Sequence, residues 1–306
     1  MVNNISINSD RIDIDLAMGL RYLLKGIQTT PNANITKHTY VHETSSKSPM
    51  GSVIYVNDKK IYLDVWEYGS PTFLIETIKE NFDLIIKLQL SKLSVDSYMN
   101  HKTLKALVAE CGEFKFREFV GKMTPWTFFP SSSFERFSGK EQDLIKNKSE
   151  NRLAFFCGKF WKSRHVALNK LREDNLELIE SDRKMLKSIS DVELIEKMLD
   201  SRIGLVLAGR SGNCMEAKNR REIEYMMMAK PLVLNYQPNY FNKLEAGRDY
   251  IYWDTSKKLS DVVSKYDLDF IGRNGYAWYL ENASLKGIGK SFEKLMTEKC
   301  IIEKRR

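Results

Sequence analysis

The sequence predicts an α/β protein of two domains, and three features of the chain support this. Its 306 residues are 42% hydrophobic and 29% charged, which suffices for two globular domains of ordinary size. Residues 152–266 alternate short apolar runs with amphipathic segments, the order typical of a doubly wound parallel sheet. Residues 124–152 contain two prolines, a serine run and many charges, which predicts an interdomain connection with a short helix inside.

The N-terminal half predicts one early helix followed by short strands. Residues 14–27 have the apolar spacing of a helix. Residues 53–56 and 60–65 flank Asn57-Asp58 and predict a β-hairpin. The apolar run 82–90 suits a buried strand, and residues 113–121 are interpreted as another short strand.

The C-terminal half is more regular. Strands are expected at residues 152–160, 202–210, 231–236 and 250–254. Helices are expected at residues 165–174, 191–201, 216–230 and 256–266. We therefore expect an N-terminal α/β domain over residues 1–140, a second α/β domain over residues 150–285 and a C-terminal helix over residues 286–306.

The net charge of +8 predicts an anionic partner, such as a nucleotide, a phosphate, nucleic acid or an anionic membrane. Nucleic acid is not the prediction, because the chain has no zinc-finger spacing, RNP-like run or basic helix-turn-helix. The N-terminus is polar, and no apolar run reaches the roughly 18 residues of a membrane span. A cytoplasmic protein is expected, with a peripheral membrane contact of the basic tail as the alternative.

Four scattered cysteines, Cys111, Cys157, Cys214 and Cys300, have no short pairing. This spacing argues against a zinc site and against a disulfide framework. Buried free thiols in a reducing compartment are the prediction.

Two loops follow predicted strands of the second half, where ligands bind in open α/β sheets. The first contains Gly158, Lys159, Lys162 and Arg164, which could approach and neutralise a diphosphate. The alternative is a basic surface turn. The second loop contains a run whose backbone amides could form an anion-binding concavity: Gly209, Arg210, Ser211 and Gly212.

The helix after the second loop carries Glu216 and Glu224. At 3.6 residues per turn they lie within about 80° of each other and about 12 Å apart along the axis, too far for a close carboxylate pair. Glu224 lies beside a methionine-rich face, where a carboxylate is costly unless it is paired or contacts a ligand. The alternative is therefore a salt bridge from Glu224 to Arg220 or Arg221.

Two glutamates separated by seven residues, Glu216 and Glu224, are followed by Pro231. This pattern resembles the donor-domain signature of nucleotide-sugar glycosyltransferases of the GT-B fold. The sequence NRREIEY, which includes Arg221, is also similar to exostosin-like transferases. The resemblance covers residues 152–266. It departs from the family pattern at Lys230, where a glycine is common before the proline.

The resemblance implies two Rossmann-like domains facing each other across a cleft, the N-terminal one reduced and variable. The final helix would pack back on the first domain. Glu224 would bind the donor ribose, Glu216 would lie near the donor sugar, and Lys159 with Lys162 or Arg164 would bind the diphosphate. A nucleotide-diphosphate sugar would be the donor and an oligosaccharide or glycoconjugate the acceptor, with no metal or other cofactor.

The resemblance leaves the stereochemistry open. The paired glutamates favour a retaining enzyme, whereas an inverting enzyme would need a base in the N-terminal half. His42 and Asp64 are the candidates, and surface histidines are the alternative interpretation of the first. Two further functions stay open: a nucleotide-sugar epimerase of the same fold, and a basic α/β binding module for nucleic acid or an anionic membrane.

Overall fold

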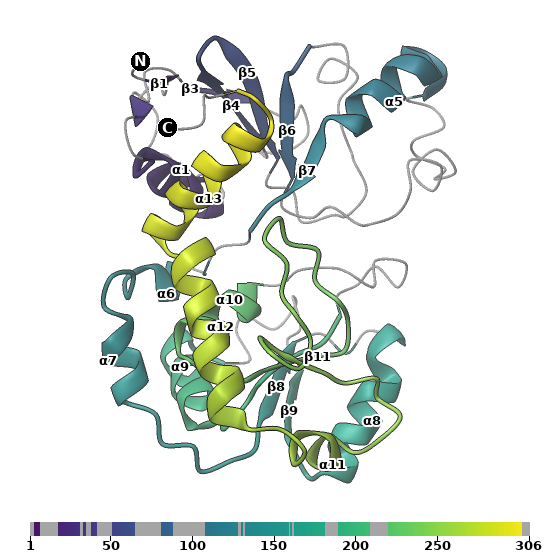
Figure 1. The fold of residues 1–306 in the computed structure, drawn as a ribbon. Coiled ribbons are helices and arrows are strands. Elements are labelled where there is room, and N and C mark those ends of the chain that lie inside the picture. The colour runs from purple at the N-terminus through teal and green to yellow at the C-terminus, as the bar shows by residue number, and fades with distance from the viewer. Residues whose placement is uncertain are drawn as a thin grey trace. The chain divides into compact units, whose positions relative to one another are not determined.

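The computed structural model describes residues 3–6, 18–30, 33–34, 38–41, 51–64, 81–87, 108–127, 130, 132–158, 160, 162–180, 189–208 and 220–301. The chain forms two compact units of mixed α/β structure (Figure 1). The first contains Met1–Thr127, Asn239–Asn242 and Leu285–Arg306, and the second contains Phe128–Pro238 and Lys243–Ser284. The chain thus passes from the first unit to the second between Thr127 and Phe128.

A mixed sheet forms the centre of the first unit, with strand order β2-β1-β4-β5-β6-β7 and β3 paired to β4. Its strands are β1 (Asn3–Ser6), β2 (Ala33–Asn34), β3 (His38–Val41), β4 (Gly51–Val56), β5 (Lys59–Asp64), β6 (Leu84–Lys87) and β7 (Met123–Pro125). The β5-β6 and β6-β7 pairs are parallel, whereas β4 is antiparallel to β1, β3 and β5.

The predicted hairpin is confirmed by β4 and β5. The two residues between them, Asn57 and Asp58, have φ of 48° and 65°. Positive φ at both central residues is the requirement of a type I′ turn, and Asn and Asp tolerate it. The buried strand predicted at 82–90 is confirmed over residues 84–87, as β6, whose four residues are all buried, and residues 88–90 lie outside the described residues.

Residues 113–121 form a helix, α5 (Glu113–Gly121), so the predicted strand at this position is wrong. Phe116, Phe119 and Val120 are buried, at the i, i+3, i+4 spacing of a helix. Phe114 is 84% exposed, although a strand would place it on the same face as Phe116. The strand prediction expected every second side chain to be buried, whereas the buried side chains follow the spacing of a helix.

Two helices pack closely in the first unit, α1 (Met18–Gln28) and α13 (Leu285–Glu298) (Figure 1). A Cβ on Gly26 would lie 2.6 Å from Ile288, and one on Gly289 would lie 2.4 Å from Thr29. The two glycines therefore permit the close approach of the helices. The beginning of the helix predicted at 14–27 lies outside the described residues.

The second unit contains a parallel sheet. Strands β8 (Phe155–Gly158) and β9 (Glu177–Glu180) pair, and β10 (Gly204–Val206), β11 (Leu232–Leu234) and β12 (Ile251–Tyr252) form a second group. A parallel bridge between Arg152 and Ser201, just before β8 and β10, aligns the two groups. The resulting order, β9-β8-β10-β11-β12, is the doubly wound order 2-1-3-4-5.

Helices cover both faces of this parallel sheet. They are α8 (His165–Glu173), α9 (Asp191–Asp200), α10 (Arg220–Met227), α11 (Leu259–Val263) and α12 (Leu268–Asn282), besides α6 (Ser132–Glu135), α7 (Glu141–Lys146) and the 3₁₀ turn η2 (Lys162–Arg164). Apolar side chains of α8 and α11 join Phe156 and Leu205 in one core cluster. Tyr225 of α10 packs over Gly204, where a Cβ would lie 2.2 Å from its ring. Strand β9 and helix α12 are absent from the sequence prediction.

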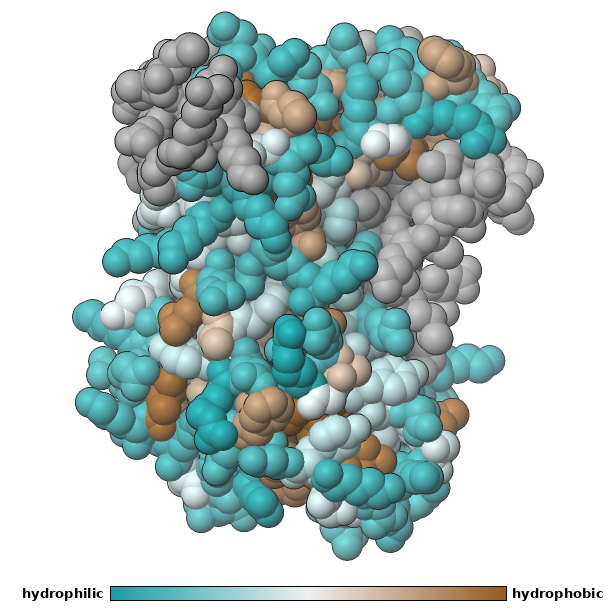
Figure 2. Space-filling view, in the orientation of Figure 1, coloured by the Kyte–Doolittle hydropathy of each residue, from teal (hydrophilic) through white to brown (hydrophobic). Residues whose placement is uncertain are grey.

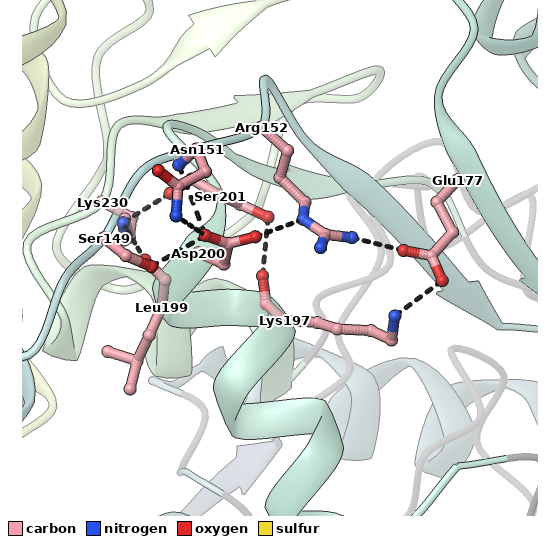
Figure 3. A network of polar contacts seen from close by, with 9 residues as sticks. All are labelled: Ser149, Asn151, Arg152, Glu177, Lys197, Leu199, Asp200, Ser201 and Lys230. Carbon is pink, nitrogen blue, oxygen red and sulfur yellow. Dashed lines mark hydrogen bonds and ion pairs between the residues drawn. The ribbon is translucent and has the colours of Figure 1, made fainter.

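A polar network holds the amino ends of β8 and β10 to the end of α9 (Figure 3). Asp200 accepts hydrogen bonds from Ser149, Asn151 and Arg152, and these bonds hold its pKa well below its usual range. Arg152 also pairs with Glu177 of β9. Because this network lies at the amino ends of the strands, we interpret it as structural support.

Lys230, the residue that departs from the family pattern, belongs to the same network (Figure 3). It is fully buried, and its Nζ donates to the carbonyl oxygens of Leu199 and Ser201 and to Glu150. The tight turn itself has its positive φ one residue earlier, at Ala229, with φ 50°. A glycine is therefore not required at position 230, where the side chain ties β11 to α9.

Hydrophilic residues predominate on the face drawn in Figure 2, with apolar residues scattered among them. Within the described part of the chain, no helix is both long and apolar enough to cross a membrane. Cys111, Cys157 and Cys300 are free thiols, as predicted, but Cys300 is exposed and the other two are only half-buried. Cys214 lies outside the described residues.

Candidate functional site

The candidate site lies at the carboxyl ends of β8 and β10. These neighbouring strands lead in opposite directions across the sheet: β8 is followed by α8 and β9, and β10 is followed by α10 and β11. Such a switch point opens a crevice beyond the strand ends, which is where open α/β sheets bind ligands. Gly158 ends β8 at this point, and Leu207 and Ala208 follow β10.

Arg164 reaches across this switch point. Its Nε donates to the carbonyl oxygen of Ala208 at 2.7 Å, and its Nη2 donates to that of Leu207 at 3.1 Å. The side chain lies over the ring of Phe156, 5.3 Å from the centroid, and the residue is 7% exposed. Burial lowers the pKa of its guanidinium to about 10, so the group stays charged at neutral pH. The carbonyl groups of Leu207 and Ala208 thus restrain the orientation of the guanidinium.

Gly158 adjoins the same guanidinium. A Cβ on Gly158 would lie 3.4 Å from Arg164 Nη1 and 3.0 Å from the ring of Phe156. The absent side chain therefore leaves the arginine room beside the strand end. The hydrogen bonds of Arg164 to Leu207 and Ala208 join the first predicted loop to the end of β10.

Two residues after β11 extend the site along the sheet edge. Asn235 Oδ1 accepts the backbone N–H of Ala208 at 2.7 Å. The hydroxyl of Tyr236 donates to Glu222 of α10, and both side chains are almost completely buried. Burial first, and the nearby Glu222 second, raise the pKa of Tyr236 well above its usual value, so the phenol remains a donor.

Glu224 is a buried residue of α10. It is 1% exposed, and its Oε2 pairs with Nη1 of Arg221 at 2.8 Å. Arg221 Nη1 also approaches the Met198 sulfur at 3.6 Å. Burial raises the pKa of Tyr225. The nearby charge of Arg221 acts to lower this pKa, and that of Glu224 acts to raise it. The salt bridge considered as the alternative for Glu224 is therefore present, with Arg221 as the partner.

The structure brings together part of the predicted site. Gly158 and Arg164 meet at the switch point, and Lys162 is exposed on η2 beside them in the chain. Asp64 ends β5 in the first unit, in register with Lys87 of β6. Seven predicted residues lie outside the described residues: His42, Lys159, Gly209, Arg210, Ser211, Gly212 and Glu216.

Three residues of the site were not predicted from the sequence: Glu222, Asn235 and Tyr236. Asn235 and Tyr236 are the last two residues of the strand predicted at residues 231–236, at the end where parallel strands bind ligands, so their position was a usable signal. Glu222 had no such signal, because a glutamate in the first turn of a helix is usually solvated.

The comparisons with known proteins add no name to this site. No family model matches the sequence, and a search of curated proteins finds no match. Among the residues that the structure describes, no group of three or more His, Cys, Asp or Glu side chains is placed to hold a metal ion.

Proposed function

We propose that the protein is a GT-B glycosyltransferase that moves a sugar from a nucleotide-diphosphate sugar to a hydroxyl acceptor, a glycan or glycoconjugate. The observation that carries the proposal is the charged guanidinium of Arg164, held by two carbonyl groups at the switch point of a parallel sheet. An anionic leaving group is the ligand that such a charge favours. The resemblance at Glu216, Glu224 and Pro231 supports the same class.

In this proposal the residues of the second unit bind the donor. Arg164 contacts the diphosphate and stabilises the negative charge that develops as the bond from the sugar to the diphosphate oxygen breaks. The acceptor oxygen forms the new bond to the sugar, and its proton passes to a base or to the leaving group. Arg164, together with Lys159 or Lys162, would supply the charge stabilisation for which other transferases use a metal ion.

Glu224 is proposed as the ligand of the ribose hydroxyls. Its carboxylate already pairs with Arg221 at 2.8 Å. The ion pair would then orient the carboxylate before the nucleotide binds. Glu216, Lys159 and the loop from Gly209 to Gly212 are proposed to complete the donor site.

Two other functions compete with this proposal. A nucleotide-sugar epimerase of the same fold would use the same diphosphate site. A basic module that binds nucleic acid or an anionic membrane would account for the net charge of +8. We propose a cytoplasmic enzyme, with membrane contact limited to the surface.

Thermal unfolding with UDP, GDP and their sugar conjugates, with and without EDTA, tests the proposal. A nucleotide at 100 times its Kd is expected to add about 2.7 kcal/mol to the stability of the native protein, and EDTA is expected to change nothing. The variant Arg164→Gln should lose this stabilisation. Arg172→Gln, a matched change on the exposed side of α8, should retain it.

The outcomes separate the three functions. Turnover of the sugar conjugate to its epimer, without an acceptor, would identify the epimerase. Binding to DNA or anionic vesicles that weakens steeply with salt, without any nucleotide effect, would identify the basic module. The transferase proposal fails if no nucleotide stabilises the wild-type protein.

A further inference from the structure

A continuous chain of contacts connects α10 to Arg164. It begins at Glu222, which is 0% exposed and accepts a hydrogen bond from Tyr236, itself 1% exposed. A carboxylate buried this completely is costly unless hydrogen bonds compensate it. The bond therefore fixes the segment that follows β11 against α10.

The second link runs from β11 to β10. Asn235 precedes Tyr236 in the chain, so the contact of Tyr236 with Glu222 also restrains Asn235. Asn235 Oδ1 accepts the N–H of Ala208 at 2.7 Å. This bond holds the peptide group between Leu207 and Ala208, beyond the last ladder residue of β10, and so orients the carbonyl group of Leu207.

The third link ends at the guanidinium. The carbonyl oxygens of Leu207 and Ala208 are the acceptors for Nη2 and Nε of Arg164. An arginine recognises a diphosphate through a planar fork, so a small rotation of the guanidinium loses part of the interaction. The orientation of these two carbonyl groups thus determines how Arg164 is presented at the switch point.

We infer that Glu222, Tyr236 and Asn235 are positioning residues that hold the guanidinium of Arg164 in the orientation that binds a diphosphate. The inference rests on the proposed function. None of the three needs to touch the ligand, because each acts through the peptide groups at the end of β10. A network of satisfied buried hydrogen bonds is the usual means by which such a group is kept in one orientation.

The test is calorimetric titration of the full chain with inorganic diphosphate and with UDP. Tyr236→Phe removes only the hydroxyl and is expected to raise the Kd for both ligands about tenfold. The matched control is Tyr279→Phe. Tyr279 is also fully buried and donates to a buried glutamate, Glu141, at 3.0 Å, but on α12 and α7. Both variants should lower the Tm, and only Tyr236→Phe should weaken binding.

Two more variants secure the result if Tyr236→Phe folds poorly. Asn235→Ala changes a half-buried residue and is expected to weaken binding similarly, with a smaller effect on Tm. Glu222→Gln retains an acceptor for the hydroxyl of Tyr236 and should keep the Kd within about threefold of wild type.

The failures of the two proposals are distinguishable. If the wild-type protein binds neither inorganic diphosphate nor UDP, the proposed function fails and the inference fails with it. If the wild-type protein binds UDP but Tyr236→Phe and Asn235→Ala bind it equally well, only the inference is overturned. An equal loss of affinity in Tyr279→Phe would also overturn it, because the effect would then be one of general stability.

Discussion

The guanidinium of Arg221 lies 2.8 Å from the carboxylate of Glu224, one turn apart on α10. Glu224 is 1% exposed, whereas the side chain of Arg221 is 30% exposed. The arginine side of the ion pair is therefore partly exposed to solvent, whereas the carboxylate side is buried. This geometry explains how a glutamate is accommodated beside Met226 and Met227, which are fully buried.

A double-mutant cycle should show that this pair is coupled. Arg221→Met leaves a buried carboxylate without this partner, and Glu224→Gln removes the charge. Each change is expected to lower the free energy of unfolding by about 1–3 kcal/mol, measured in urea. The double variant should lose less than the sum, with a coupling energy of at least about 0.5 kcal/mol. Strictly additive losses would show that the ion pair contributes nothing to stability.

Much of the second unit could be predicted from its sequence, because its strands are apolar runs bounded by glycine or proline. The strands that became β8, β10, β11 and β12 all lie within predicted ranges. Strand β9 was missed because its exposed ends are glutamates, Glu177 and Glu180, and only the middle is apolar. Helix α12 was missed although its capping residue, Asp267, accepts the N–H of Phe270.

The candidate site was only partly predictable. Arg164 follows a strand and a glycine, so its sequence position indicated a role at the sheet edge. The interactions that orient it come from residues 207 and 208, more than 40 positions away, and no local pattern reports such a pairing. The pairing of Glu224 with Arg221 was foreseeable from their spacing, whereas the bond from Tyr236 to Glu222 depends on tertiary packing.

Replacement of Lys230 by methionine should destabilise the second unit. The change removes the donor that satisfies the buried carbonyl groups of Leu199 and Ser201. An unsatisfied buried acceptor costs about 1–3 kcal/mol, and this is the expected decrease in the free energy of unfolding. The control is Lys197→Met, whose ion pair with Glu177 is partly exposed and should contribute less than about 1 kcal/mol. Equal losses would contradict the special role of Lys230.

Lys230 should also give the stability a distinct pH dependence. Burial lowers its pKa in the folded protein from 10.5 to about 8. Below pH 8 the lysine is protonated in both states, and the full cost of burying the charge is present. Between pH 8 and 10.5 the unfolded state binds more protons, so the stability of the native protein rises with pH. Relative to Lys230→Met, the wild-type protein should gain up to roughly 3 kcal/mol over this range.

Urea titrations of both proteins at several pH values measure this difference. The subtraction removes the contributions of other titrating groups, provided that they are the same in both proteins. A difference that stays constant from pH 7 to 10.5 would show that burial does not alter the pKa of Lys230.

A glycine at position 229 should stabilise the protein. Ala229 has φ 50° at the end of α10, where the N–H of Lys230 bonds to the carbonyl of Tyr225. This is the left-handed position of a helix C-terminus, which glycine occupies without strain. Ala229→Gly is expected to raise the free energy of unfolding by about 0.5–1 kcal/mol.

The control for this effect is Ala283→Gly at the end of α12. Ala283 has φ −124° and is fully buried, so glycine gains nothing there and loses a packed methyl group. This change should lower the free energy of unfolding by about 1 kcal/mol. Destabilisation by both glycines would contradict the assignment of strain to position 229.

Paired phenylalanine substitutions should verify the helix at residues 113–121. Phe116 is fully buried in a cluster with Val53, Tyr62 and Ile85, whereas Phe114 is 84% exposed. Phe116→Ala is expected to lower the free energy of unfolding by about 3–5 kcal/mol, and Phe114→Ala by less than about 0.5 kcal/mol. A strand would place both side chains on one face, so similar losses in thermal or urea unfolding would contradict the helix.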